Sequence, residues 1–177
     1  LDLGLPDGAG LDLLADLRVT HHPGDAVSLM RVANRPRRGI GDTSIARLVN
    51  YADGRNTSLW EAMGHVEEAG LAAASGRAVT QFRNVMESLM ATATDANVAD
   101  IVEAVLDRSG YLESLEAERT IEARGRIENL EELVGVAREY DAGGEARSLS
   151  GFLPEISLYS DQDALRGREE GDGGQVN

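Results

Sequence analysis

The sequence predicts an all-α fold, built as one compact multi-helix domain. Hydrophobic residues make up 42% of the 177-residue chain but aromatic residues only 4%, and alanine, leucine, glutamate and arginine are abundant. These residues favour helices, whereas strands are typically built from β-branched and aromatic residues. Apolar residues also recur at helical spacing through most of the chain. Because a chain of this length can bury one proper core, a single helical domain is the expected arrangement.

Helix-capping side chains indicate where the predicted helices begin. Asp25, Asp42 and Asn97 each precede an amphipathic run as N-cap residues. Ser58 and Glu61 have the spacing of a capping box. The predicted helices span 11–19, 26–33, 43–53, 58–70, 77–93, 98–109, 111–118, 121–140 and 148–160.

Glycines and composition shifts indicate where helices and the domain end. Gly54 and Gly70 are the expected stops of two of the helices. Residues 1–10 are rich in Gly, Pro and Asp and are expected to be a flexible lead-in or an artificial extension. The helical domain is expected over 11–160, followed by an acidic, Gly-rich tail or linker at 161–177.

Composition excludes several classes of enzyme chemistry. All 17 basic residues are arginine and there is no cysteine, so a P-loop lysine, a Schiff base, a thiolate nucleophile and a cysteine zinc site are excluded. His21, His22 and His65 are a poor metal-ligand set, because adjacent side chains point in different directions. The acids are scattered along expected solvent faces, so no catalytic residue and no metal site is predicted. No membrane-spanning run or secretory leader is visible, which indicates a soluble cytoplasmic protein.

One short segment is basic on an otherwise acidic chain. The formal net charge is -14, yet residues 31–55 hold six arginines against two aspartates, whereas 101–177 hold eight arginines against 18 acids. The overall negative field of such a protein repels polyanions, so a cluster of arginines in one segment indicates a local site for an anion. They surround a Gly-Ile-Gly sequence at 39–41, between two predicted helices.

The Gly-Ile-Gly segment is the candidate site for binding an anion. Glycines at 39 and 41 let the backbone approach a ligand, and the start of the next helix exposes N–H groups at the positive end of its dipole. Ile40 is expected to anchor the turn in the core, while arginines and hydroxyls contact phosphate oxygens. The side chains expected to contact phosphate are Arg35, Arg37, Arg38, Thr43 and Ser44.

The same segment has a plainer interpretation. An ordinary helix–turn–helix connection can contain Gly-x-Gly, with its arginines paired to nearby acids, and spacing alone leaves the two interpretations equally open. The inverted local charge favours binding. If the arginines do bind, replacing Arg37 and Arg38 by alanine is expected to weaken binding while leaving thermal stability nearly unchanged.

Three segments carry a resemblance to a known family. They are RGIGDTS at 38–44, SGYLESLEAE at 109–118 and RIENLEELV at 126–134. In this order and separation they resemble the 2B subdomain of UvrD/PcrA/Rep-type superfamily 1A DNA helicases. The similarity runs through roughly residues 11–165.

The resemblance implies an accessory, regulatory element of an ATP-dependent 3′-to-5′ DNA helicase. Its Gly-Ile-Gly turn would contact the DNA backbone at a single-strand/duplex junction as a helix–hairpin–helix-like element, and rotation of the subdomain would control unwinding. The residues that match this element are Arg38, Gly39, Ile40, Gly41, Asp42, Thr43 and Ser44, with Arg37 beside it. ATP and Mg²⁺ would bind in the motor subdomains of the parent protein, and no cofactor in this segment. The family-marker helix, expected to serve packing or interdomain contact, comprises Arg126, Ile127, Glu128, Asn129, Leu130, Glu131, Glu132 and Leu133.

Partners follow from the same resemblance. They are duplex DNA, the motor subdomains of the same helicase, and repair proteins or a second copy, with no membrane and a cytoplasmic, nucleoid-associated location. Motor-domain motifs are absent, so the chain is interpreted as an excised, non-enzymatic subdomain. A second hypothesis stays open: a protein-interaction and autoinhibitory module with little DNA affinity, which the acidic bulk favours.

Overall fold

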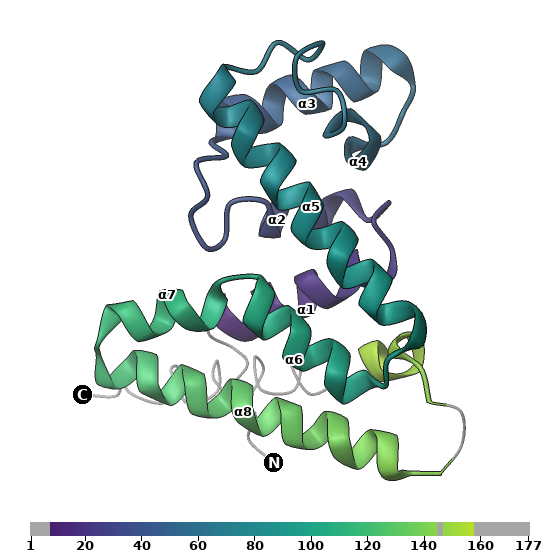
Figure 1. Ribbon diagram of the computed structural model, residues 1–177, viewed down its shortest axis with the longest axis vertical. Helices are drawn as coiled ribbons and strands as arrows, with labels where there is room; N and C mark the ends of the chain where they lie inside the picture. The colour runs from purple at the N-terminus through teal and green to yellow at the C-terminus, as the bar shows by residue number, and fades with distance from the viewer. Residues whose placement is uncertain (1–7, 145–146, 158–177) are drawn as a thin grey trace, which may run out of the picture.

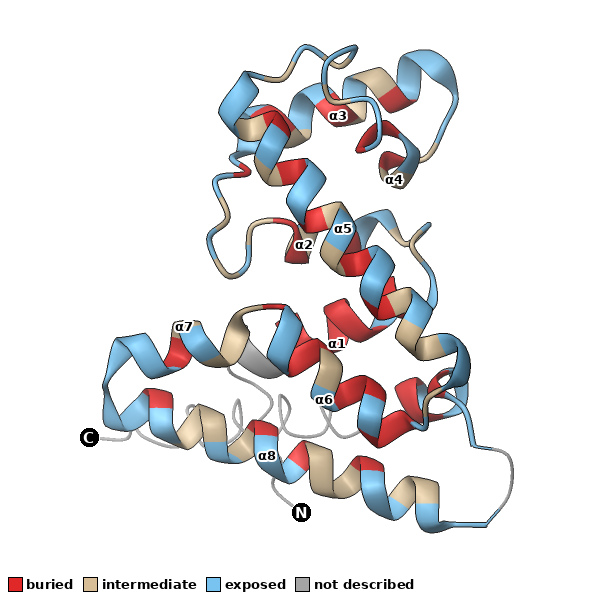
Figure 2. Ribbon diagram, in the orientation of Figure 1, coloured by how far each residue is buried: buried red, intermediate tan, exposed pale blue. Residues whose placement is uncertain are grey.

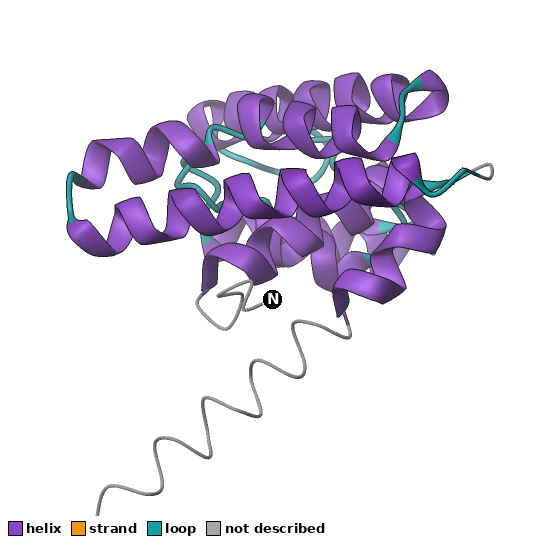
Figure 3. Ribbon diagram, turned by 90° about the horizontal axis from the view of Figure 1, so that it is seen from below, coloured by secondary structure: helices purple, strands orange, loops and turns teal. Residues whose placement is uncertain are grey.

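The computed structural model describes residues 8–144 and 147–157, and within these ranges it contains helices and connecting loops with no strand (Figure 3). The predicted all-α fold is confirmed. The helices are α1 (Gly8–His21), α2 (Ala26–Val32), α3 (Asp42–Arg55), α4 (Leu59–Ala62), α5 (Ala73–Asp95), α6 (Val98–Arg108), α7 (Tyr111–Glu118) and α8 (Ile121–Ala142). A further helical segment covers 149–157.

Several helix starts lie where capping chemistry predicts them. The Asp25 carboxylate accepts a hydrogen bond from the Ser28 amide at the start of α2. Asn97 caps α6 by accepting from the Asp100 amide at 2.8 Å. Ser58 and Glu61 form the complete capping box of α4. Each cap satisfies an amide that the first helical turn leaves without a partner.

Two predicted boundaries of α3 are wrong. Gly41 is the N-cap, and Asp42 is the first helical residue and makes no side-chain cap. Its carboxylate still lies at the positive end of the helix dipole, where a negative charge is favourable. The helix also passes through Gly54 and ends at Arg55, because Asn56 adopts the left-handed conformation that terminates helices.

The helix predicted over 58–70 is much shorter than expected. α4 stops at Ala62, and the chain continues through turns as far as Gly70, whose φ is +75°. Gly64 follows directly after the helix C-cap, and glycine has a low helix propensity. α5 and α1, by contrast, begin four and three residues before their predicted starts, at Ala73 and Gly8.

The helices form two tiers joined by the long helix α5 (Figure 1). α3 and α4 pack on each other near the N-terminal end of α5, whereas α6, α7 and α8 form the other tier, and α1 packs against α2, α5 and α6. The buried positions lie on the facing sides of these helices (Figure 2). The core includes Leu17, Leu29, Phe82, Val102 and Phe152, each at most 1% exposed.

α8 carries the family-marker sequence and packs along α6 and α7. Leu130, Leu133 and Ala137 are buried, as their spacing predicts, and Ile127 and Val134 are half-buried against the core. Asp141, near the end of α8, accepts hydrogen bonds from the first two amides of α6. The buried side of the marker helix therefore packs within the domain.

The expectations for the chain ends are only partly covered by the structure. Residues 8–10 belong to α1, while 1–7 and the predicted tail at 161–177 lie outside the described residues. None of the helices in the described part of the chain is sufficiently long and apolar to cross a membrane.

Candidate functional site

The Gly-Ile-Gly turn lies in the loop 33–41 that joins α2 to α3. Ile40 is 1% exposed and is part of the hydrophobic core, so the predicted anchor is confirmed. Gly39 has φ of +83°, a conformation that other residues rarely adopt, and both glycines are exposed. The turn is thus held from below by Ile40 while its two glycines face solvent.

Asn34 fixes the shape of the turn from inside the loop. Its side-chain oxygen accepts hydrogen bonds from the amides of Arg38, at 2.8 Å, and Ile40, at 3.2 Å. These two amides are therefore not available to a ligand. The amides of Gly41, Asp42 and Thr43 bind no acceptor among the described residues, and all three residues are exposed. The backbone donors on offer are those at the start of α3.

Replacing Asn34 by alanine is expected to destabilise the protein by about 1–3 kcal/mol, since it leaves two turn amides without an acceptor. Urea denaturation followed by circular dichroism measures the change. Asn50→Ala is the matched control, because Asn50 is exposed on α3 and makes no hydrogen bond among the described residues. Equal stabilities of the two variants would contradict the role given to Asn34.

Arg38 is bound into the fold. Its Nη1 donates to the carbonyls of Val32 and Arg35, both at 2.8 Å, and to that of Pro36 at 3.3 Å. Its Nη2 donates to the carbonyl of Ser109 at 2.7 Å, and the guanidinium lies 5.2 Å from the ring centroid of Phe82.

Burial lowers the pKa of Arg38, although arginine stays charged under ordinary conditions. The guanidinium ties the loop to the junction of α6 and α7, where Ser109 lies. Removing it would deprive the Ser109 carbonyl of this donor, whereas the Val32 carbonyl would keep its bond from the Arg35 amide. The expectation that the Arg37 and Arg38 double replacement leaves stability unchanged is therefore wrong for Arg38.

The neighbouring arginines differ in how firmly they are held. Arg31 donates to the buried carboxylate of Asp12 at 2.8 Å, and the Arg35 guanidinium lies 3.8 Å from the same carboxylate. The Arg35 side chain is still 61% exposed. Arg37 is exposed and has no hydrogen-bond or ion-pair partner within 8–144 and 147–157. Arg37 is therefore the side chain most available to an anion.

The remaining predicted contacts divide into exposed and buried ones. Asp42 and Thr43 are exposed at the first turn of α3. Ser44 is buried, at 8% exposed, so its hydroxyl is poorly placed for a ligand on the surface. The structure therefore gathers Arg35, Arg37 and the α3 amides on one surface and turns Ile40 and Ser44 inward.

Sequence reasoning missed three polar residues beneath the site: Asn34, Asp12 and Asp16. Asp12 and Asp16 are at most 3% exposed and one turn apart on α1. The signal for them was present, because both are acids within an otherwise apolar helical run. A buried acid generally requires a cation nearby, and the arginines of the loop provide one.

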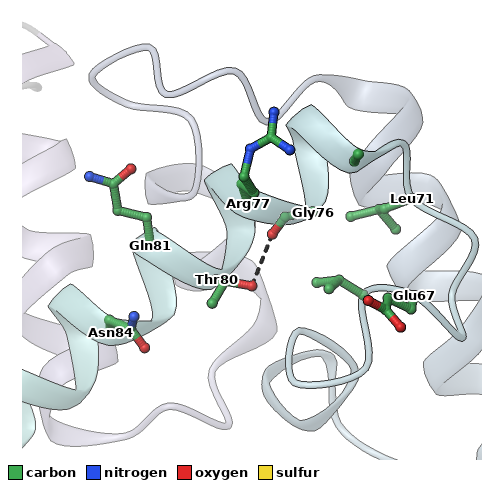
Figure 4. A pocket seen from close by; sticks show the side chains of 9 residues that line it. Glu67, Leu71, Gly76, Arg77, Thr80, Gln81 and Asn84 are labelled. Carbon is green, nitrogen blue, oxygen red and sulfur yellow. Dashed lines mark hydrogen bonds between the residues drawn. The ribbon is translucent and has the colours of Figure 1, made fainter.

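A separate groove of about 480 Å³ lies between the 64–72 turns and α5 (Figure 4). Leu71 and Gly76 contribute to its lining, while Arg77 and Gln81 lie on one side. The Thr80 hydroxyl is used within α5, where it donates to the Gly76 carbonyl at 3.0 Å. This arrangement contains no recognisable catalytic constellation, so we assign no chemistry to the groove.

Metal binding has no support in the described part of the chain, which contains no group of three potential ligands. His21 ends α1, and His22 follows it in an exposed turn. His65 lies apart from both and contacts Glu68 at 3.1 Å.

Known DNA helicases contain a segment similar to this chain. The chain is 34% identical over 164 residues to the ATP-dependent DNA helicase PcrA of Bacillus subtilis, which is 93% of this chain and 22% of that protein. It is 36% identical over 154 residues to the proteins of the same name from Staphylococcus aureus and Staphylococcus epidermidis. The chain is homologous to one segment of the PcrA-type DNA helicases. It spans about a fifth of the length of these relatives, and no family model matches it.

The homology with PcrA-type helicases agrees with the recognised motifs. Matches over 86% to 93% of the chain leave only a short stretch outside them, so they include both the Gly-Ile-Gly loop and the marker helix. The site therefore belongs to a segment that the chain shares with PcrA-type helicases.

Proposed function

We propose that this chain is the 2B subdomain of a UvrD/PcrA-type helicase and holds duplex DNA through its Gly-Ile-Gly turn. The supporting observation is an anchored turn that offers, on one exposed surface, α3 amides and an Arg37 that has no partner among the residues the structure describes. Such donors grip phosphate oxygens without reading base sequence. The relatives are DNA helicases by name, which makes DNA the expected polyanion.

The proposed role is accessory and non-enzymatic. The turn contacts the backbone of the duplex next to its junction with single-stranded DNA, and rotation of the subdomain controls unwinding. ATP and Mg²⁺ act in motor subdomains of the parent helicase, with which this segment packs. Further partners would be repair proteins or a second copy. Within the turn, Arg35, Arg37, Gly39, Gly41, Asp42 and Thr43 form the contact surface, whereas Arg38, Ile40 and Ser44 support it.

Replacing Arg37 by alanine is expected to weaken duplex binding about tenfold, because it removes a charge-assisted contact to phosphate. The slope of log affinity against log salt should fall by about 0.9 for each phosphate that the variant no longer neutralises. Fluorescence anisotropy with a labelled tailed duplex at low salt measures both quantities.

Arg124→Ala is the control for Arg37→Ala. Arg124 is also exposed and has no partner in the described ranges, and it lies on α8, so the control makes the same charge change away from the turn. Arg37→Ala and Arg124→Ala binding with equal affinity would refute the contact at the turn.

A second function, protein interaction and autoinhibition, is supported by a different surface. Val27 and Met30 are 77% and 43% exposed and lie three residues apart on α2, where they form an apolar face. The chain also carries a formal net charge of -14, which disfavours DNA over most of its surface. This second function is favoured if the unmodified chain does not bind duplex at low salt but self-associates, and if Val27→Asp abolishes the self-association.

A further inference from the structure

A hollow of about 600 Å³ lies between the loop that carries the turn and the helices α7 and α8. Arg35 and Arg37 line it from the loop, and Arg126 lines it from α8. In Figure 1 the loop between α2 and α3 passes above α7, with the start of α8 beneath. The hollow therefore joins the basic segment to the first residue of the RIENLEELV sequence, although the two are far apart along the chain.

Two carboxylates beside this hollow, those of Asp12 and Glu118, differ in how firmly the fold holds them. Asp12 has a side chain only 4% exposed and is engaged by Arg31, by Arg35 and by the Tyr111 hydroxyl at 3.3 Å. The Glu118 carboxylate lies 3.3 Å from the Arg126 guanidinium, and its side chain is 44% exposed. Asp12 is thus fixed in the fold, whereas Glu118 is free to move into water.

Charge balance favours an anion in the hollow. Four arginines line it against three carboxylates, in a chain whose formal net charge is -14. Arg37 is without a partner in the described part of the chain, and Arg35 lies at 3.8 Å from its carboxylate, beyond hydrogen-bond length. Two of the guanidinium groups therefore have unused donors that face one concave surface.

We infer that the hollow binds one phosphate group of the same DNA strand that the turn contacts, between Arg37 on the loop and Arg126 on α8. Binding exchanges the Glu118 carboxylate for the phosphate at Arg126, while Asp12 keeps Arg31 and Arg35 in place. The inference rests on the proposed function. It adds a contact from the marker helix, for which packing or interdomain contact had been expected.

The shape and position of the hollow favour a strand phosphate over a free carboxylate. A hollow of about 600 Å³ has room for a phosphate together with the sugars attached to it, and the exposed turn beside it suits an extended backbone. Arg37 and Asp42 line the hollow and also belong to the turn region, so the two surfaces are continuous. Two guanidinium groups converging on one phosphate is an arrangement that arginine geometry favours.

The test uses the full 177-residue chain and a fluorescein-labelled duplex with a single-stranded tail. Arg126→Gln is expected to weaken binding about tenfold and to lower the salt slope by about 0.9. Arg124→Gln removes the same charge from the same helix, outside the hollow, and should change affinity less than about twofold by screening alone. Glu118→Gln should tighten binding, since it removes the carboxylate that competes for Arg126.

The outcomes separate this inference from the proposed function. If Arg126→Gln and Arg124→Gln bind alike while Arg37→Ala still weakens binding, the phosphate site in the hollow is overturned and the contact at the turn stands. If the unmodified chain does not bind the duplex at all, both proposals fail.

Two further measurements guard against an unfolded variant and against a different ligand. Thermal melts identify a variant that has unfolded. If Arg126→Gln is unfolded, the duplex affinity of Glu118→Gln becomes the test, and weaker or unchanged binding by that variant overturns the inference. A polyglutamate peptide tests for an acidic protein partner. If the peptide displaces duplex from the unmodified chain but not from Arg126→Gln, and the two proteins bind duplex equally well, the hollow belongs to a protein partner and the inference is overturned.

Discussion

Replacing Asp16 by asparagine is expected to raise the free energy of unfolding at pH 8 by about 2–5 kcal/mol. Asp16 is 1% exposed, and neither carboxylate oxygen has a hydrogen-bond partner in the described structure. Burial raises its pKa from 3.8 to about 8, with Arg38 opposing the rise and Asp12 adding to it. Asparagine has nearly the same shape and cannot ionise, so it removes the cost of the buried charge.

The expected pH dependence has a definite sign. The unfolded chain releases the Asp16 proton near its ordinary pKa of 3.8, whereas the folded protein keeps it until about pH 8. Stability from this group is therefore complete below pH 3.8 and is lost progressively as pH rises toward 8. In the Asp16→Asn variant that decline should disappear.

Urea denaturation at several pH values from about 5 to about 8, which lie within the expected decline, measures this effect. Asp107→Asn is the matched control, because Asp107 is an exposed acid with no partner in the described ranges. Its stability should follow that of the unmodified protein at every pH. An unmodified protein whose stability does not change across this range would contradict the raised pKa.

Replacing Ile40 by alanine is expected to cost about 2–5 kcal/mol and to reduce duplex binding, since it creates a cavity beneath the turn. Ile40 is the core anchor of a loop that otherwise depends on Asn34 and Arg38. Denaturant unfolding gives the stability change, and anisotropy with the tailed duplex gives the change in affinity.

Ile40→Val provides the graded control for this cavity, with an expected cost of about 0.5–1.5 kcal/mol and near-normal binding. A loss of stability in Ile40→Ala without any loss of affinity would mean that the turn does not need its anchor to hold DNA. That result would separate the fold of the loop from its proposed function.

Local rules predicted the helices well where the deciding interaction is close in sequence. The caps at Asp25, Ser58 and Asn97 each involve residues three apart, so the sequence displays both partners. The inward positions of α8 follow from helical period, and Ile40 follows from being the one large apolar residue between two glycines. These features needed no knowledge of the tertiary structure.

The parts that sequence could not predict depend on contacts between distant segments. Arg38 has the side chain of a typical phosphate ligand, yet its Nη2 donates a hydrogen bond to the Ser109 carbonyl, 71 residues away in the sequence. The pairing of Arg35 with Asp12 likewise brings the loop onto α1. Because arginine serves equally as an internal donor and as a phosphate ligand, its role is decided by which carbonyls and carboxylates the fold places nearby.

The hydrogen bond from Arg38 to the Ser109 carbonyl also connects the loop that carries the turn to the joint between α6 and α7. Ser109 closes α6, and Gly110 opens α7 with Pro36 of the loop lying 3.7 Å from where a Cβ on that glycine would be. Any bending at the joint between α6 and α7 must either carry the turn along or break this contact. A partner that displaces α7 would therefore also displace the loop whose surface is proposed to face DNA.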